Sequence, residues 1–279
     1  MQVASSALIV LCLVCVWMVL QMLVLGGISE DRSQSLLYAK FRSELALATA
    51  PVGALDYNGQ PVQPGAPVAL LSIPAIGVNQ VVVDGTASGD LLAGPGHLRS
   101  TMMPGQQGYS AIAGRASTYG APFADLGQLK VGDPITVTTG QGTVTYRVTD
   151  LRHAGDHQPQ PISGTQGMLT LITAGSSGFA SMLRPHDVFY VDAIAPKALA
   201  AGVTPGMNVP SSEQPMARDS GALPLLTLLL AGLAGAVLAI AVLRRRFSAV
   251  LVWVLATPVV IALAWAVTDT VMRLLPNLM

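Results

Sequence analysis

The chain has 279 residues, and its 15 basic and 15 acidic residues give a formal net charge of zero. Charged residues make up only 11% of the chain and hydrophobic residues 51%. This balance excludes a disordered chain, which needs low hydrophobicity and high net charge, and it argues against a nucleic-acid partner, which favours a basic excess. The apolar excess instead predicts membrane-spanning segments, with membrane lipid as a partner.

The N-terminal segment is the first candidate span. Residues 1–29 carry no charge, and residues 7–25 are almost continuously apolar, close to the roughly 20 residues that cross a bilayer. A cleaved signal peptide is the competing interpretation, but it would have a basic start and a shorter apolar core. We therefore expect an uncleaved transmembrane anchor over residues 1–28.

Two further regions precede the most structured part of the chain. Residues 30–49 place apolar side chains at helical spacing among charged ones, which predicts a helix. Residues 50–66 are rich in proline and glycine and are typical of a linker. Residues 29–66 are thus expected to form a juxtamembrane helix and linker.

Residues 67–196 have the pattern of an all-β domain. Apolar and polar residues alternate with period two over 135–138 and 143–148, and Gly140–Gly142 supplies a turn between them. The runs 169–171 and 188–190 predict two later strands. Many short strands within about 130 residues indicate a single barrel or sandwich.

The last part of the chain predicts a return to the membrane. Residues 197–221 are rich in proline, serine and glycine and are expected to be a flexible tether. Residues 222–268 contain two apolar runs separated by Arg244–Arg246, which predicts a transmembrane hairpin, and residues 269–279 form a tail. The positive-inside rule places the arginines in the cytoplasm and the β domain outside the plasma membrane, that is, extracytoplasmic.

Several segments of the β domain resemble one known family. Ile73–Val78, Asp90–His97, Thr118–Phe123 and Leu169–Thr173 occur in the order and spacing of the sortases, cysteine transpeptidases of the Gram-positive surface. Sortases cut a sorting signal on an exported protein and join it to an amine of the envelope. The resemblance implies an all-β, sortase-type closed β-barrel with short helices, here combined with three transmembrane α-helices.

Three side chains, a His, a Cys and an Arg, carry the chemistry of the family. The resemblance places Arg115 at the His position and Ala174 at the Cys position. Asp187 occupies the Arg position, and Arg184 is a possible substitute for that arginine. The resemblance therefore implies that all three positions are degenerate.

These replacements remove the chemistry of acyl transfer. The reaction needs a thiolate, which alanine lacks, and arginine stays protonated and cannot exchange protons usefully. The two cysteines of the chain, Cys12 and Cys15, lie in the first apolar run, so no shift of register supplies a thiol. We expect a catalytically inactive pseudoenzyme without cofactor or metal. The alternative is a sortase-type transpeptidase or hydrolase with a non-standard nucleophile, Ser176 or Ser177.

The remaining polar residues leave several interpretations open. His153, Asp156 and His157 are compatible with a metal site, with a loop that contacts a substrate or partner, or with a solvated loop, and we expect no metal. His97 is expected to form hydrogen bonds within a turn.

The expected function is the binding or scaffolding of another membrane or exported cell-surface protein. Arg115, Tyr119 and Arg184 are possible binding residues of the former active-site groove. A structural role for Arg115, paired with a nearby acid, is the competing interpretation. A purely structural membrane component, with the barrel as a cap, is a further alternative.

Overall fold

The computed structural model describes residues 16–17, 20–21, 25–159, 162, 164–175, 187–202, 210–243 and 246–279. The chain forms two compact units. The barrel unit comprises Met22–Ala217 and Pro276–Met279, and the hairpin unit comprises Met1–Gln21 and Arg218–Leu275.

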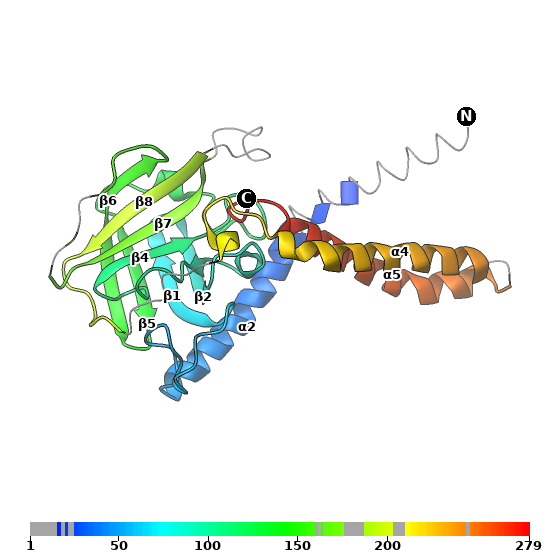
Figure 1. Cartoon of the computed structure of the whole chain (residues 1–279), viewed down its shortest axis with the longest axis horizontal. Coiled ribbons are helices and arrows are strands. Elements are labelled where there is room, and N and C mark those ends of the chain that lie inside the picture. Colours follow the sequence, from blue (N-terminus) through cyan, green and yellow to red (C-terminus); the bar gives the residue numbers. More distant parts are fainter. Residues whose placement is uncertain are drawn as a thin grey trace. The chain divides into compact units, whose positions relative to one another are not determined.

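The barrel unit contains a closed β-barrel with the strand order β1-β2-β3-β4-β7-β8-β6-β5 (Figure 1). The pairs β2·β3 and β4·β7 are parallel, and the other neighbours are antiparallel. This confirms the predicted all-β fold. The strands are β1 (Pro67–Ile73), β2 (Val78–Asp84), β3 (Gly96–His97), β4 (Gly108–Ala113), β5 (Pro134–Thr139), β6 (Gly142–His153), β7 (Gly167–Gly175) and β8 (Asp187–Ala195).

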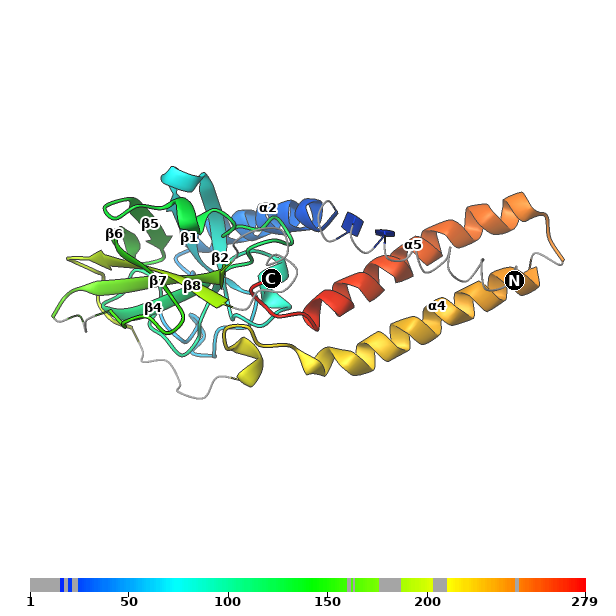
Figure 2. The ribbon, with the colours of Figure 1, turned by 90° about the horizontal axis from the view of Figure 1, so that it is seen from above.

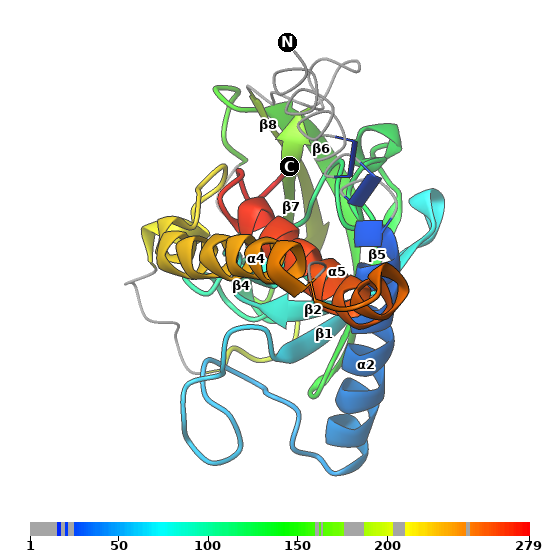
Figure 3. The same cartoon turned by 90° about the vertical axis from the view of Figure 1, so that its right-hand side faces the viewer.

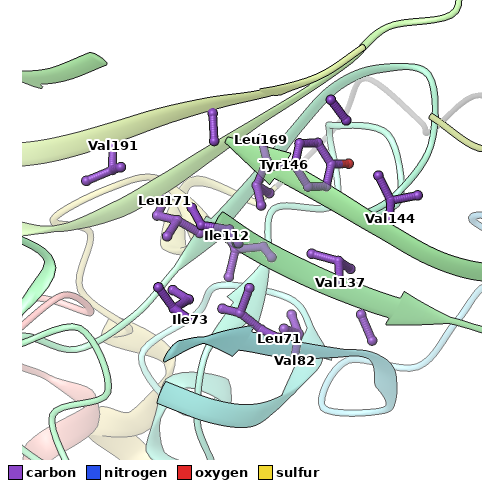
Figure 4. Packing of buried hydrophobic residues seen from close by; sticks show 14 of the residues in the cluster. Leu71, Ile73, Val82, Ile112, Val137, Val144, Tyr146, Leu169, Leu171 and Val191 are labelled. Carbon is purple, nitrogen blue, oxygen red and sulfur yellow. The ribbon is translucent and has the colours of Figure 1, made fainter. Parts of the chain in front are cut away.

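Period-two alternation explains how β5 and β6 fit the barrel wall. Ile135 and Tyr146 pair across the two strands and are fully buried, while the outward-facing Thr138 and Thr143 hydroxyls lie 3.1 Å apart. The buried Tyr146 hydroxyl accepts a 2.9 Å hydrogen bond from the Gly105 backbone N–H. Figure 4 shows the apolar side chains that meet in the barrel interior, among them Leu71, Ile73, Val82, Ile112, Val137, Val144, Leu169, Leu171 and Val191.

Short 3-10 helices connect the strands, as the resemblance implied. They lie at Pro74–Ile76, Asp90–Leu92 and Leu126–Gln128. The first of them ends at Gly77, whose φ of 68° is a left-handed conformation that glycine adopts without steric cost.

Helix α2 (Gly26–Ala46) runs beside β1 and β2 (Figure 3). Phe41 is buried in one apolar cluster with Val81 of β2. Gln34 also fixes the helix to β2, because its side-chain oxygen accepts a 2.7 Å bond from the Val81 N–H and its Nε2 donates to the Val81 and Ala93 carbonyls at 3.1 and 2.7 Å. A helix was predicted over 30–49, and the observed helix begins earlier, at Gly26, and ends earlier, at Ala46.

The hairpin unit is built from α4 (Leu223–Leu243) and α5 (Ala249–Arg273), which lie side by side (Figure 2). Its segments Ser220–Ile240 and Val250–Arg273 are long and apolar enough to cross a membrane by length and composition. Most of the anchor expected over 1–28, together with Arg244 and Arg245, lies outside the described residues.

A flexible tether was expected over residues 197–221 and a tail over residues 269–279. In the described parts of these segments, the structure shows buried residues that bind the barrel unit. Glu213 has only 3% of its surface exposed; its carboxylate accepts bonds from the Arg99 guanidinium, and its backbone carbonyl accepts a 2.5 Å bond from the Thr86 hydroxyl. Asn277 donates its backbone N–H to the Ala217 carbonyl at 2.9 Å. Single buried anchors hold these segments on the barrel, which a proline-rich composition does not reveal. We call Pro276–Met279 the strap.

Two buried carboxyl groups predict how the stability of the barrel depends on pH. Burial, with a smaller contribution from Asp31, raises the pKa of Glu30 from 4.5 to about 7. Burial and the charge of Glu213 raise the pKa of Asp90 from 3.8 to about 6. Both groups bind protons more tightly when folded, so their stabilisation is fully present below the unfolded pKa values and is lost as pH rises through 6 to 7.

We therefore expect the melting temperature of the full chain in detergent to fall between pH 5 and pH 8. The Glu30 contribution is on the order of 1–3 kcal/mol, and Glu30→Gln should remove it and be more stable than the natural chain at pH 8. The exposed Asp125→Asn variant is the control and should keep the natural profile. If the melting temperature of Glu30→Gln fell as steeply with rising pH as that of the natural chain, the prediction would be contradicted.

Candidate functional site

Arg115 lies two residues after the end of β4, and its side chain is fully buried. All three guanidinium nitrogens donate to oxygen atoms of the barrel unit. Nε donates to the Leu91 carbonyl at 3.2 Å, and Nη1 donates to the Thr118 hydroxyl at 3.0 Å and the Met279 carbonyl at 3.1 Å. Nη2 donates to the carbonyl and the hydroxyl of Ser88, both at 2.9 Å. Arg115 therefore donates five hydrogen bonds to other residues of the same chain.

No acidic side chain is among the hydrogen-bond acceptors that the structure describes for Arg115. Its five acceptors are backbone and hydroxyl oxygens, and the ring centre of Tyr119 lies 5.6 Å from the guanidinium carbon. Burial lowers the pKa of Arg115 to about 10, which still leaves the side chain charged at neutral pH. Tyr119 is only 2% exposed. The structure thus places both expected groove residues in the interior, and Arg115 bonds to backbone and hydroxyl oxygens and not to an aspartate or glutamate side chain.

Ala174 lies near the end of β7 and is 4% exposed. It pairs with Val188 of β8, and the next pair in the register joins Gly175 to Asp187. Positions 174 and 187, to which the resemblance assigns the Cys and the Arg of the family, therefore lie close together on adjacent strands. Their side chains here are a methyl group and a carboxylate.

A cavity of about 520 Å³ opens at this end of the barrel. Apolar side chains of Phe123, Leu151 and Phe189 form one part of its wall, and polar side chains form another. The full lining is Phe123, Ala124, Gly127, Leu151, His153, Thr173, Ala174, Gly175, Asp187 and Phe189. Ala174 lines the cavity, whereas Arg115 does not.

His153 and Asp187 form a pair in the wall of this cavity. His153 Nδ1 lies 2.6 Å from Asp187 Oδ2, and both side chains are partly exposed. Asp187 Oδ1 also accepts backbone N–H bonds from Val188 at 2.8 Å and Ala154 at 3.3 Å. The antiparallel pairing of β6 with β8 brings His153 to this place. The pair is not evident from the sequence, because its members are 34 residues apart.

The other members of the histidine cluster point to a loop. Asp156 accepts a 2.7 Å bond from the His153 backbone N–H, and His157 is exposed. Over the part of the chain that the structure describes, no group of three or more histidine, cysteine or acidic residues is arranged to hold a metal ion. Arg184, Ser176 and Ser177 lie outside the described residues.

His97 has a structural environment away from the cavity. It is buried in β3, with Nδ1 3.1 Å from Asp84 Oδ1 and Nε2 3.0 Å from the Met102 carbonyl. His97 forms hydrogen bonds as expected, but it lies in strand β3 and not in a turn.

The cavity has apolar and polar lining residues that can contact a ligand, but none of these residues carries a thiol. Thr173, a hydroxyl residue of the cavity lining, donates its 3.0 Å hydrogen bond to the Gly114 carbonyl and is buried. The only cysteines of the sequence are Cys12 and Cys15. An apolar wall next to a partly exposed His–Asp pair suits a ligand with both apolar and polar groups.

Part of the chain is similar to known sortases. A family model described as the sortase domain matches residues 71–180. Sortase A of Listeria monocytogenes is 28% identical over 122 residues, which cover 43% of this chain and 53% of that protein. Sortase SrtE1 of Streptomyces coelicolor is 31% identical over 96 residues, 32% of this chain and 27% of that protein. A solved Sortase D5 transpeptidase of Clostridium perfringens is 22% identical, with a TM-score of 0.48, and the match covers 59% of this chain and 98% of that structure.

The closed barrel and the family-model match define a sortase-like domain: residues 71–180 of this chain are similar to the sortase domain. The chain spans about half the length of the Listeria protein that it matches, and less of the Streptomyces protein.

Proposed function

We propose that this chain is a membrane-anchored, sortase-like pseudoenzyme that binds or scaffolds another membrane or exported cell-surface protein. The observation that carries the proposal is Ala174, a methyl group at the end of β7 in the wall of the cavity. Without a nucleophile at this position, the covalent acyl intermediate of the family has no atom to form on.

The two other replacements support the same conclusion. The guanidinium of Arg115 is buried and engaged in five hydrogen bonds, so it neither reaches the cavity nor shuttles protons at neutral pH. Asp187 places a carboxylate where the family has a cation. A negative group there would oppose the oxyanion that develops during acyl transfer.

The proposed location is the plasma membrane, with the barrel unit outside. In this arrangement α4 and α5 cross the membrane, Arg244–Arg246 lie in the cytoplasm, and residues 1–28 form a third span. In a variant that lacks Cys12 and Cys15, a cysteine introduced at the exposed Val131 should react with an impermeant maleimide on intact cells, and a cysteine at Arg246 should not. The reverse labelling would overturn the topology.

Purified full chain in detergent should not cleave sorting-signal peptides above the blank rate. Ala174→Cys should also show no turnover, because the added thiol has neither an imidazole partner at position 115 nor a cation at position 187. Product release is measured chromatographically, with Listeria sortase A as the positive control.

The alternative function makes the opposite prediction for the natural chain. A hydrolase or transpeptidase that uses a serine would turn over such peptides, and Ser176→Ala or Ser177→Ala would abolish this turnover. That result would overturn the pseudoenzyme proposal.

The binding role is tested by filling the cavity. Gly127 lines the cavity, and a Cβ atom at this position would meet no atom within 4 Å, so a larger side chain fits without backbone strain. Gly127→Phe should abolish crosslinking to the membrane partner, whereas the matched Gly127→Ala variant should retain it. Equal crosslinking by both variants would place the partner elsewhere on the molecule.

A further inference from the structure

The strap binds the barrel unit through its backbone, next to the degenerate His position. The Ala116 backbone N–H donates to the Leu278 carbonyl at 2.9 Å. The Met279 carbonyl accepts two bonds, from the Thr118 hydroxyl at 2.6 Å and from Arg115 Nη1 at 3.1 Å. Two successive backbone carbonyl groups of the strap therefore accept hydrogen bonds from the loop that follows β4.

The side chains of the strap are recognised as well. Leu278 is fully buried in an apolar cluster that contains Ala174, the residue at the Cys position. The cluster is lined mainly by small residues, which leave room for a leucine; its other buried members are Leu91, Ala111, Ala113, Ala116 and Ile172. Asn277 is 1% exposed, and its Nδ2 donates to the carbonyls of Thr86 at 2.8 Å and Gln214 at 3.0 Å.

These contacts have the character of a peptide-binding site. A buried leucine provides apolar burial, an asparagine amide provides specific hydrogen bonds, and backbone carbonyls are held by a guanidinium and an N–H group. The ligand segment has only four residues, and the chain before it, Arg218–Leu275, belongs to the other unit. The strap is thus held on the barrel unit by its own contacts.

We infer that the barrel unit has a peptide-binding site at Arg115, Ala116 and Thr118, which is occupied in cis by the strap and is open to exchange. Its ligand is a short peptide that forms a turn, with an asparagine followed by a leucine, as the strap does through its 3.1 Å bond from the Met279 N–H to the Pro276 carbonyl. The inference rests on the proposed function in one respect, because it treats Arg115 and Ala174 as binding positions and not as catalytic ones. Release of the strap leaves Arg115 Nη1 and the Ala116 N–H without their strap acceptors, so the empty site favours another peptide carbonyl.

The first test uses the full chain shortened to end at Leu275, in detergent, with its melting transition as the check of folding. A fluorescent, N-acetylated Leu-Pro-Asn-Leu-Met amide should bind this variant saturably, as measured by fluorescence anisotropy. The peptide with aspartate in place of the second leucine should bind at least about tenfold more weakly, because it would bury a charge. The unshortened chain, whose strap competes for the site, should bind the leucine peptide at least about tenfold more weakly than the shortened chain.

Failure of the folded, shortened chain to bind, or equal binding of both peptides, would overturn the inference. Should the shortened chain not fold, a protease site inserted after Leu275 lets the strap fold in place before it is cut. The released strap peptide should then dissociate, and excess free peptide should accelerate its loss from the site. If the cut strap stayed bound until the barrel unit melted, the inference that the strap exchanges with other peptides would be contradicted.

Sorting-signal turnover is measured on the same samples to separate the two proposals. Turnover that appears after strap release would overturn the pseudoenzyme proposal and leave the peptide-binding site standing. Absence of peptide binding together with absence of turnover would overturn only the peptide-binding site.

Discussion

Arg115→Ala should lower the free energy of unfolding by about 3–5 kcal/mol, because it leaves five buried or partly buried oxygen acceptors without their donor and opens a cavity. Arg115→Met fills more of the space but leaves the same oxygens unpaired, so it should also be strongly destabilising. Arg115→Lys keeps the charge, but a single ammonium group lacks the planar fork that reaches Leu91, Ser88 and Met279 together. Thermal unfolding of the full chain in detergent measures these losses.

Arg147→Ala is the matched control for this prediction. Arg147 is exposed and donates a 3.0 Å bond from Nη1 to the Gly132 carbonyl, so its removal should cost less than about 1 kcal/mol. A loss for Arg115→Ala as small as that of the control would show that the buried hydrogen bonds do not stabilise the fold.

Asp192→Ala should destabilise the barrel unit by a similar amount, about 3–5 kcal/mol. Asp192 of β8 is fully buried; its Oδ2 accepts a 2.6 Å bond from Arg152 Nε and its Oδ1 a 2.5 Å bond from the Thr170 hydroxyl. Removal of the carboxylate leaves the Arg152 guanidinium, whose side chain is only 13% exposed, without its ion-pair partner. Pulse proteolysis across a urea series measures the loss.

Asp150→Ala, on the neighbouring strand β6, is the control for Asp192→Ala. Asp150 is exposed and accepts only a local bond from the Leu151 N–H at 2.9 Å. We expect a change within about 0.5 kcal/mol for this surface position. Equal urea midpoints for the two variants would contradict the prediction.

Local patterns were sufficient to predict an all-β domain, and the resemblance to sortases added the closed barrel. The alternation of β5 and β6 follows from side chains that face opposite sides of a strand, so a window of a few residues contains the whole signal. The missing thiol was also predictable, since a count of two cysteines in an apolar run does not depend on alignment. The positions of Ala174 and Asp187 came from the resemblance to sortases.

Contacts between distant parts of the chain escaped the sequence analysis. Arg115 and Met279 are 164 residues apart, and nothing in either local sequence indicates that one binds the other. An arginine after a buried strand is most simply read as facing solvent or a groove, because isolated buried charges are costly. Its actual burial depends on five acceptors from four separate residues, which only the folded chain assembles.

The discontinuity of the barrel unit also constrains the order of its biogenesis. The strap follows the helical hairpin in the chain, so both apolar helices are synthesised before the last four residues of the barrel unit exist. Until then, the loop after β4 lacks the carbonyl groups of Leu278 and Met279 that it binds in the finished protein. In the proposed topology, export of residues 67–195 and insertion of the hairpin would therefore precede the binding of the strap to the barrel unit.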